Sequence, residues 1–141
     1  MERLLEFAAN HWGLTLALLG VLAALGGTFV YPRIQGIRRV TPLDATQMIN
    51  REEALVLDVR LEAEFKEGHI LNSLHIPMKY LSEQTRKLDK HRSRPIITVC
   101  RTGQQSAGAS AMLRKRGFER VYNLSGGILA WQNASLPLTK K

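Results

Sequence analysis

The sequence predicts an α/β protein, a parallel sheet with helices on both faces, preceded by one membrane-spanning helix. Two short apolar runs, Ala54–Val59 and Ile96–Val99, are typical of buried parallel strands. Segments of helical composition alternate with these runs, and such alternation indicates a sheet covered on both faces. A third stretch, Trp12–Tyr31, has no charged residue over 20 positions, about the length that a helix needs to cross a bilayer.

These features divide the 141 residues into four parts. We expect a short tail at 1–11, a transmembrane helix at 12–31, a basic linker at 32–39 and an α/β domain at 40–138. The net charge of +8 is concentrated after the helix, and a basic domain suits nucleic acid, anionic lipid or an anionic substrate. We expect no nucleic-acid partner, because the basic residues are scattered without a recognition motif, and the run Arg86–Arg94 is interpreted as a solvated face.

The apolar stretch is expected to be an uncleaved membrane anchor. Trp12 and Tyr31 flank it as interfacial aromatics, and Pro32 is expected to end the helix. A cleavable signal peptide is a rival interpretation, but the preceding segment is not basic and the stretch exceeds the roughly 7–15 apolar residues of such a peptide. A buried core helix is another rival interpretation, although a domain this small cannot bury a helix that is apolar on every face.

Positive charges around the stretch predict its orientation. Arg33, Arg38 and Arg39 follow it, whereas Arg3 alone precedes it, so the C-terminal domain is expected in the cytoplasm. The single cysteine, Cys100, agrees with a reducing compartment because it makes no internal disulfide. Small residues four apart would allow two such helices to associate weakly: Gly20 with Ala24, and Ala23 with Gly27.

Residues that typically begin or end helices predict the other elements of the domain. Thr41 and Pro42 indicate a helix start, as N-cap and first helical residue. Gly68 and Gly117 predict the ends of two helices, and Gly126 the turn before the last one. The expected elements are helices at 61–67, 78–90 and 105–116, short strands at 75–77 and 121–123, and a final helix that contains Trp131.

Cys100 is the candidate nucleophile. It ends a predicted strand, where open α/β sheets bind ligands, and it begins a tight loop that feeds a helix. The N–H groups and dipole of that helix favour a thiolate or an anionic persulfide, and Arg101 adds positive charge. Gly103 permits backbone torsions that turn N–H groups inward, and Ser106 is expected to cap the helix or donate a hydrogen bond.

Each candidate residue also has a purely structural interpretation. Cys100 as an inert buried thiol is disfavoured by its position at a strand end before a glycine loop. Asp58 and Arg60 are possible supporting residues of the site, more typical of structural contacts, with Arg60 expected near Glu64. His69 and His75 are expected as hydrogen-bonded packing residues, Trp131 as core, and Gly126 and Gly127 as turn residues. No metal is expected, because the sequence has no CxxC and no Cys/His pair at ligand spacing.

Several short motifs, taken in order, resemble the rhodanese family over about residues 40–138. They are LDVR at 57–60, EF at 64–65, GHI at 68–70, SLHIP at 73–77, the strand and cysteine loop at 96–106, GF at 117–118, and LSGG at 124–127 with Trp131. The resemblance implies a five-stranded parallel sheet flanked by helices. A membrane span before a single such domain also looks like a bacterial arrangement, which implies a single-pass protein of the inner (cell) membrane.

The resemblance also implies a sulfurtransferase that uses no cofactor and no metal. Cys100 would take a sulfane sulfur from thiosulfate or a persulfide, hold it as a persulfide, and pass it to a thiol, an acceptor protein or cyanide. The family's substrate-binding loop corresponds here to Arg101, Thr102, Gly103, Gln104, Gln105 and Ser106.

The loop departs from the family pattern at Gln105, where many members have arginine. An amide donates a hydrogen bond without charge, which weakens the case for a dianion such as thiosulfate. The alternative is therefore a catalytically weak, rhodanese-like interaction or scaffold module at the membrane. A phosphatase is disfavoured, because the loop from Cys100 to Gln105 has only six residues and lacks the arginine that fits phosphate.

Overall fold

The computed structural model describes residues 1–34 and 36–141, and of residues 31–34 only the backbone. The expectations for the side chains of Tyr31 and Arg33, and for Gln35 in the linker, fall outside the described residues. The chain divides into two compact units, Met1–Gln35 and Gly36–Lys141.

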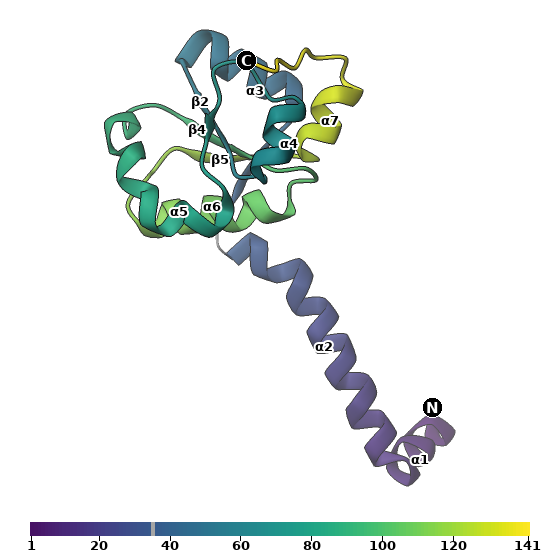
Figure 1. Ribbon diagram of the computed structural model, residues 1–141. Coiled ribbons are helices and arrows are strands. Elements are labelled where there is room, and N and C mark those ends of the chain that lie inside the picture. Colours follow the sequence, from purple (N-terminus) through teal and green to yellow (C-terminus); the bar gives the residue numbers. More distant parts are fainter. Residues whose placement is uncertain (35) are drawn as a thin grey trace. The chain divides into compact units, whose positions relative to one another are not determined.

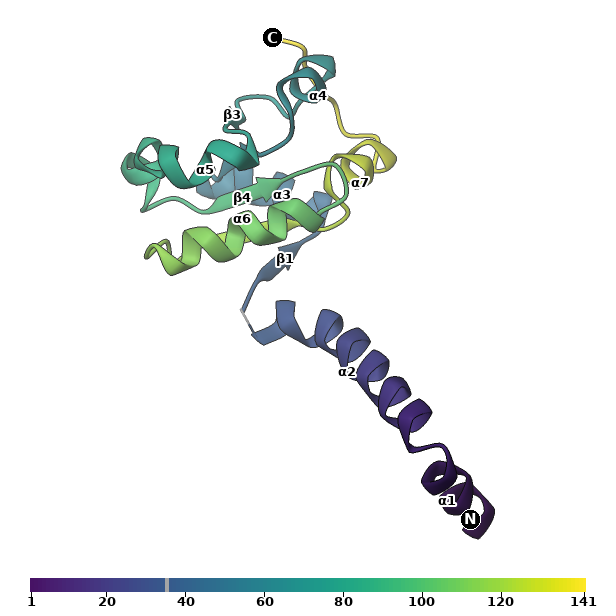
Figure 2. The same ribbon diagram turned by 60° about the horizontal axis from the view of Figure 1, so that its bottom comes forward.

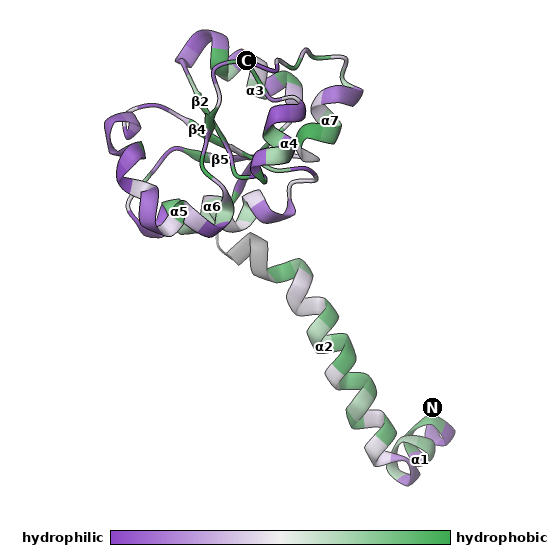
Figure 3. Cartoon of the chain, in the orientation of Figure 1, coloured by the Kyte–Doolittle hydropathy of each residue, from purple (hydrophilic) through white to green (hydrophobic). Residues whose placement is uncertain are grey.

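The first unit consists of two helices, α1 (Glu2–Asn10) and α2 (Trp12–Ile34). The segment expected as a tail is therefore mostly helical, and His11 separates the two helices with a non-helical backbone. Residues Trp12–Val30 are apolar enough and long enough to cross a membrane, and Figure 3 shows hydrophobic colouring along α2. This window is not buried, unlike the core helix of a soluble protein.

The expectation that Pro32 ends the membrane helix is wrong, because α2 continues to Ile34. Proline lacks one N–H donor and disfavours helical backbone in the residue before it. It does not remove the donors of the residues that follow, so two more residues remain helical.

The second unit contains a five-stranded sheet in the order β1-β5-β4-β2-β3, with every pair parallel (Figure 1). The strands are β1 (Arg38–Val40), β2 (Leu55–Asp58), β3 (Leu74–His75), β4 (Ile96–Val99) and β5 (Val121–Leu124). The predicted parallel sheet and its two central strands are thus confirmed.

Strand β1 was not predicted from the sequence. It occupies the last part of the expected linker, where Arg38 pairs with Tyr122 and Arg39 with Asn123 at the sheet edge. An edge strand needs only one buried residue to hold it, and Val40 supplies it. Two arginines followed by one valine carry no alternating pattern, which is why the strand resembles a linker.

Helices cover both faces of the sheet (Figure 1). One face carries α5 (Met78–Gln84), the 3₁₀ helix η1 (Thr85–His91) and α6 (Gln104–Lys115). The other carries α3 (Pro42–Glu52) and α7 (Gly127–Asn133), while α4 (Glu62–Glu67) follows β2. Figure 2 shows α6 running alongside β4, to which it is joined by a buried hydrogen bond between Ser110 Oγ and Thr98 Oγ1 of 2.6 Å.

The central strands are buried on both sides, and their residues alternate between two cores. Leu57 packs with α5 and α6, whereas its neighbour Val56 packs with α3 and α7. In β4, Ile97 and Val99 belong to the second core, while Ile96 and the following Cys100 belong to the first. The strand periodicity therefore directs the side chain of Cys100 toward the α6 face.

The predicted helix boundaries are confirmed with small shifts, except that the helix expected at 78–90 is two elements, α5 and the 3₁₀ helix η1. The strand expected at 75–77 is β3 at Leu74–His75. Thr41 Oγ1 accepts a hydrogen bond from Asp44 N at 3.2 Å, as expected for an N-cap. Helix α6 begins at Gln104 after Gly103 as N-cap, so Ser106 lies inside the helix and does not cap it. Gly117 follows α6 at a φ of 90°.

Replacing Leu57, whose side chain is fully buried, tests the core. We expect Leu57→Ala to lower the free energy of unfolding by about 2–5 kcal/mol, because a cavity remains between β2 and its helices. The matched control, Leu43→Ala, removes the same atoms from a residue that is 67% exposed and should change it by less than about 0.5 kcal/mol. Chemical denaturation followed by circular dichroism measures both, and equal losses would contradict this assignment of the core.

Candidate active site

Cys100 lies directly after β4, at the edge where the parallel strands end. Arg60 follows β2 at the same edge, Pro77 follows β3, and Ser125 follows β5. Because all five strands are parallel, residues distant in sequence gather there. This edge is called the carboxyl edge below.

Two donors contact the sulfur of Cys100. Gly103 N donates to Sγ at 3.0 Å, and Ser106 Oγ lies 3.2 Å from Sγ. The first contact depends on the φ of 95° at Gly103, a left-handed conformation that glycine adopts without steric cost. Cys100 is only 3% exposed, so these hydrogen bonds act on a sulfur largely shielded from water.

Asn123 of β5 holds the sulfur's two donors in place, and sequence reasoning missed it. Its Oδ1 accepts a hydrogen bond from Ser106 Oγ at 2.6 Å, and its Nδ2 donates to Gly103 O at 2.9 Å. Ser106 has one proton, which it can give either to Asn123 or to Cys100 Sγ. The hydroxyl can therefore accept from a neutral thiol and, after rotation, donate to an anionic sulfur.

The start of α7 fixes the peptide groups of the loop from behind. Ile128 N donates to Cys100 O at 2.9 Å, and Leu129 N donates to Arg101 O at 3.2 Å. Gly127 makes this approach possible, because a Cβ at that position would overlap Cys100 O and the carbonyl of Arg101. Gly127 also has a φ of 60°, so its conformation and its surroundings both require glycine.

A cleft of about 610 Å³ opens in front of Cys100. Its wall is formed by the loop and by the segments after β2 and β3, namely Val59, Arg60, Leu61, Glu64, Pro77, Met78, Lys79, Arg101, Thr102, Gln104 and Gln105. A neighbouring cleft of about 500 Å³ shares Arg60, Glu64 and Arg101 with the first. The combined opening is larger than a small anion requires.

The structure brings most of the predicted site residues together. Arg101, Thr102, Gln104, Gln105 and Arg60 line the cleft in front of Cys100. Gly103 and Ser106 contact the sulfur itself, and Asp58 lies behind Arg60.

Lys79, which lines the cleft, is a second site residue that the sequence did not predict. It follows the short strand β3, and the rule that strand ends gather at one edge would have found it. Its ammonium group, together with Arg101, gives the cleft two exposed cations beside one carboxylate, Glu64.

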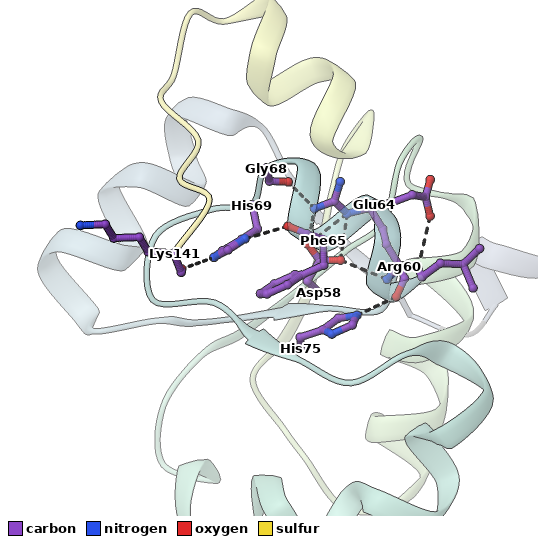
Figure 4. A network of polar contacts seen from close by, with 9 residues as sticks. Asp58, Arg60, Glu64, Phe65, Gly68, His69, His75 and Lys141 are labelled. Carbon is purple, nitrogen blue, oxygen red and sulfur yellow. Dashed lines mark hydrogen bonds and ion pairs between the residues drawn. The ribbon is translucent and has the colours of Figure 1, made fainter.

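Asp58 and Arg60 form a buried ion pair, with Arg60 Nη2 at 2.7 Å from Asp58 Oδ2 (Figure 4). Arg60 Nη2 also donates to Gly68 O at 2.8 Å. The expected contact between Arg60 and Glu64 is not formed, because Glu64 instead accepts a hydrogen bond from Leu61 N. Asp58 thus takes up the positive charge of Arg60, while Arg60 also lines both clefts.

His69 and His75 are packing residues, as the sequence predicts. The two rings stack on Phe65, with centroids 3.8 and 4.3 Å from its own (Figure 4). His75 Nε2 bonds to Arg60 O at 2.8 Å, and His69 bonds through both ring nitrogens to backbone oxygens of Phe65 and Lys141. Within residues 1–34 and 36–141, no three His, Cys, Asp or Glu side chains are arranged to hold a metal.

Comparisons with known proteins agree with this geometry. A family model described as a rhodanese-like domain matches residues 41–134. The chain is 30% identical over 141 residues to the uncharacterized protein YibN of Escherichia coli K12, covering 99% of each chain. It is 32% identical over 95 residues to the thiosulfate sulfurtransferase GlpE of Coxiella burnetii, covering 67% of this chain and 87% of the relative. A solved rhodanese-related protein from Thermoplasma volcanium has a TM-score of 0.68 at 30% identity, covering 74% of this chain and 99% of its own.

Replacing Gly127 tests the close contact between α7 and the cysteine loop. We expect Gly127→Ala to lower the free energy of unfolding by about 2 kcal/mol or more, because the methyl group forces the carbonyls of Cys100 and Arg101 away. The control, Gly108→Ala in α6, places a Cβ 3.6 Å from the flexible end of Met78 and should leave stability unchanged or raised by up to about 1 kcal/mol. Denaturation of both variants measures this, and a Gly127→Ala protein as stable as the control would contradict the assignment.

Proposed function

The chain belongs to the rhodanese-like domain family, and from this premise we propose that it is a sulfurtransferase carrying sulfane sulfur on Cys100. One observation carries the proposal: the sulfur of Cys100, at the base of a cleft, accepts a hydrogen bond from Gly103 N and lies 3.2 Å from Ser106 Oγ, which can turn its proton toward an anionic sulfur. Donors aimed at a shielded sulfur stabilise a negative charge on it. Both the thiolate and the persulfide anion carry that charge.

The proposed reaction has two displacement steps. In the first, the Cys100 thiolate attacks the outer sulfur of a donor such as thiosulfate. A sulfur–sulfur bond to Sγ forms while the donor's own sulfur–sulfur bond breaks, and sulfite leaves with the bonding electron pair. In the second, a nucleophile such as a thiolate or cyanide attacks the outer sulfur of the persulfide, and the Cys100 thiolate leaves. Atoms and electrons balance without a cofactor.

Positive charge in the cleft supports an anionic donor. Arg101 and Lys79 line its wall, while Gln105 holds the position where many family members have arginine. Lys79 comes from the segment after β3, so the charge missing from the loop is supplied from another part of the fold. We therefore include thiosulfate among the donors, beside persulfides, which need less charge compensation.

The proposal also includes a membrane anchor. Residues 12–30 have the length and hydropathy of a span, and the match to the protein of Escherichia coli extends over this segment. Arginines follow the span and would hold the domain on the cytoplasmic side of the inner membrane. A reducing cytoplasm keeps Cys100 available as a thiol.

A scaffold function is the second candidate, and Gln105 favours it. A loop that ends in Gln105 instead of arginine binds a dianion less well, so a membrane-tethered domain could serve its partners without turnover. The two candidates differ in their dependence on the thiol: binding of a partner would survive Cys100→Ser, whereas sulfur transfer would not.

Loading of Cys100 with sulfur is the direct test. Incubation of the purified protein with thiosulfate or glutathione persulfide should add the mass of one sulfur atom, which intact-mass spectrometry detects. Cys100→Ser should show no gain, because it removes the only thiol of the chain. Absence of loading with either donor, or a gain that persists in Cys100→Ser, would leave the scaffold function as the better account.

The charge of the cleft predicts donor preference. Gln105→Arg should lower KM for thiosulfate about tenfold with kcat changed less than about twofold, because a charge-assisted hydrogen bond adds roughly 1.5–3 kcal/mol. Lys79→Gln should raise the same KM, while Lys66→Gln, an exposed lysine paired with Glu62 outside the cleft, should have no effect. Steady-state kinetics with thiosulfate and cyanide measure all three, and a KM insensitive to both cleft substitutions would contradict this role for charge.

A further inference from the structure

The edge of the sheet opposite Cys100 carries almost all of the domain's net charge. Four segments lead into the starts of β1, β2, β4 and β5: residues 36–38, 50–54, 85–95 and 113–120. We call them together the amino edge. They hold 11 of the 18 Lys/Arg of residues 36–141 but only four of the ten Asp/Glu, a net charge of +7. The rest of the domain is left with only +1.

The four segments form one continuous surface. Arg114 Nη1 donates to Gly36 O at 2.9 Å, and Arg92 Nη1 donates to Arg116 O at 3.2 Å. Arg94 Nε donates to Glu53 O at 2.6 Å. These contacts join the start of β1 to the end of α6, the end of α6 to the segment after η1, and that segment to the end of α3. The run Arg86–Arg94, interpreted from the sequence as a solvated face, is therefore part of a larger basic surface.

Little of this charge is neutralised within the domain. Only Arg92 and Arg120 have carboxylate partners, Asp89 and Glu52, among the described residues. Most of the basic side chains are exposed. The pKa of His91 lies below its usual value, because burial and then the cations Arg94 and Lys90 disfavour a further positive charge. The surface thus has a positive field that attracts anions.

We propose that the amino edge binds the headgroups of an anionic lipid membrane. The sequence places the amino edge next to the proposed membrane span, because only three residues separate the end of α2 at Ile34 from the start of β1 at Arg38. So short a connection reaches at most about 14 Å, whatever the direction of the span. Basic residues this close to a bilayer gain from its negative surface potential.

Lipid fits this surface better than nucleic acid does. Proteins that bind single strands stack bases on exposed aromatic rings. Phe118 is the only aromatic residue in the four segments, and it is 3% exposed beneath the Arg92 guanidinium, 4.1 Å from its ring centroid. The surface offers dense positive charge but no exposed aromatic ring on which a base could stack, which matches a field of headgroups better than a single strand.

Membrane binding through the amino edge would orient the proposed active site, although this binding does not itself depend on sulfur chemistry. Parallel strands place their two ends at opposite edges of the sheet. A domain bound through its amino edge turns the carboxyl edge, with Cys100 and its cleft, away from the lipid. Donors and acceptors would then arrive from the aqueous phase.

Vesicle sedimentation tests the proposal with residues 36–141, since the apolar α2 would bind any vesicle. This part folds without the span, because both hydrophobic cores draw their residues only from Val40 to Leu138. We expect binding to vesicles with about 30 mol% phosphatidylglycerol in phosphatidylcholine, little binding to phosphatidylcholine alone, and loss of binding near 1 M salt, where the Debye length is about 3 Å.

Two triple variants with equal loss of charge locate the surface. Lys87→Gln, Lys90→Gln and Lys115→Gln together should weaken binding at least tenfold, because each lysine near the lipid contributes about fivefold. The matched control, Lys66→Gln with Lys140→Gln and Lys141→Gln, removes three lysines outside the amino edge and should weaken it less than about threefold. Circular dichroism confirms that both remain folded.

Three outcomes would overturn the proposal. They are equal binding to neutral and anionic vesicles, equal losses in the two triple variants, and binding to an RNA oligonucleotide in fluorescence polarisation that is stronger than binding to vesicles. Sulfur loading of the same variants is a separate measurement, so a failure of lipid binding is distinguishable from a failure of the proposed enzyme.

Discussion

The contact between Gly127 and the backbone of Cys100 and Arg101 is the constraint on which the site depends. Only a residue without Cβ allows α7 to start there, and only then do Ile128 N and Leu129 N reach the loop carbonyls. With the carbonyls directed toward α7, Gly103 N points at the sulfur. The last helix of the fold therefore sets the geometry of a loop that lies nearly 30 residues earlier in the chain.

A second layer of contacts determines what the sulfur meets. Asn123 bonds both to the carbonyl of Gly103 and to the hydroxyl of Ser106, and it is buried within β5. Asp58 pairs with Arg60 and leaves the field of the cleft to Arg101 and Lys79. An uncharged amide bonded to Ser106 lets that hydroxyl adapt to a thiol or an anion, whereas a buried carboxylate in its place would repel the anion. The network thus suits a sulfur whose charge changes during a reaction.

What the sequence predicts well is local. Residues 96–116 form a strand, the cysteine, a glycine turn and a helix in immediate succession. Composition and helix-ending or turn-forming residues are therefore enough to predict these elements, and the roles of Cys100 and Gly103 follow from their order. Lys79 follows from the rule that the ends of parallel strands gather at one edge, whereas Asn123 reaches the site only through the pairing of β5 with β4, which no local pattern contains. Strand β1 is short, rich in arginine and held by pairing with β5, so its long-range partner decides its structure. Pro32 shows that a local signal can also mislead. Proline disfavours helical structure, yet α2 continues past it to Ile34 because the surrounding helix outweighs that preference.

The parallel sheet gives the two edges of the domain different physical characters. Loops at the carboxyl edge build a cleft around a shielded sulfur, which is what selective chemistry on a small group requires. Segments at the amino edge carry exposed, mostly unneutralised cations that contact no part of that cleft. Because the strands separate the two edges, a charge added at one is felt only weakly at the other after screening by salt. The proposed attachment and the proposed catalysis can then be tuned by separate substitutions, and an attachment surface at the amino edge would leave the cleft open to substrates.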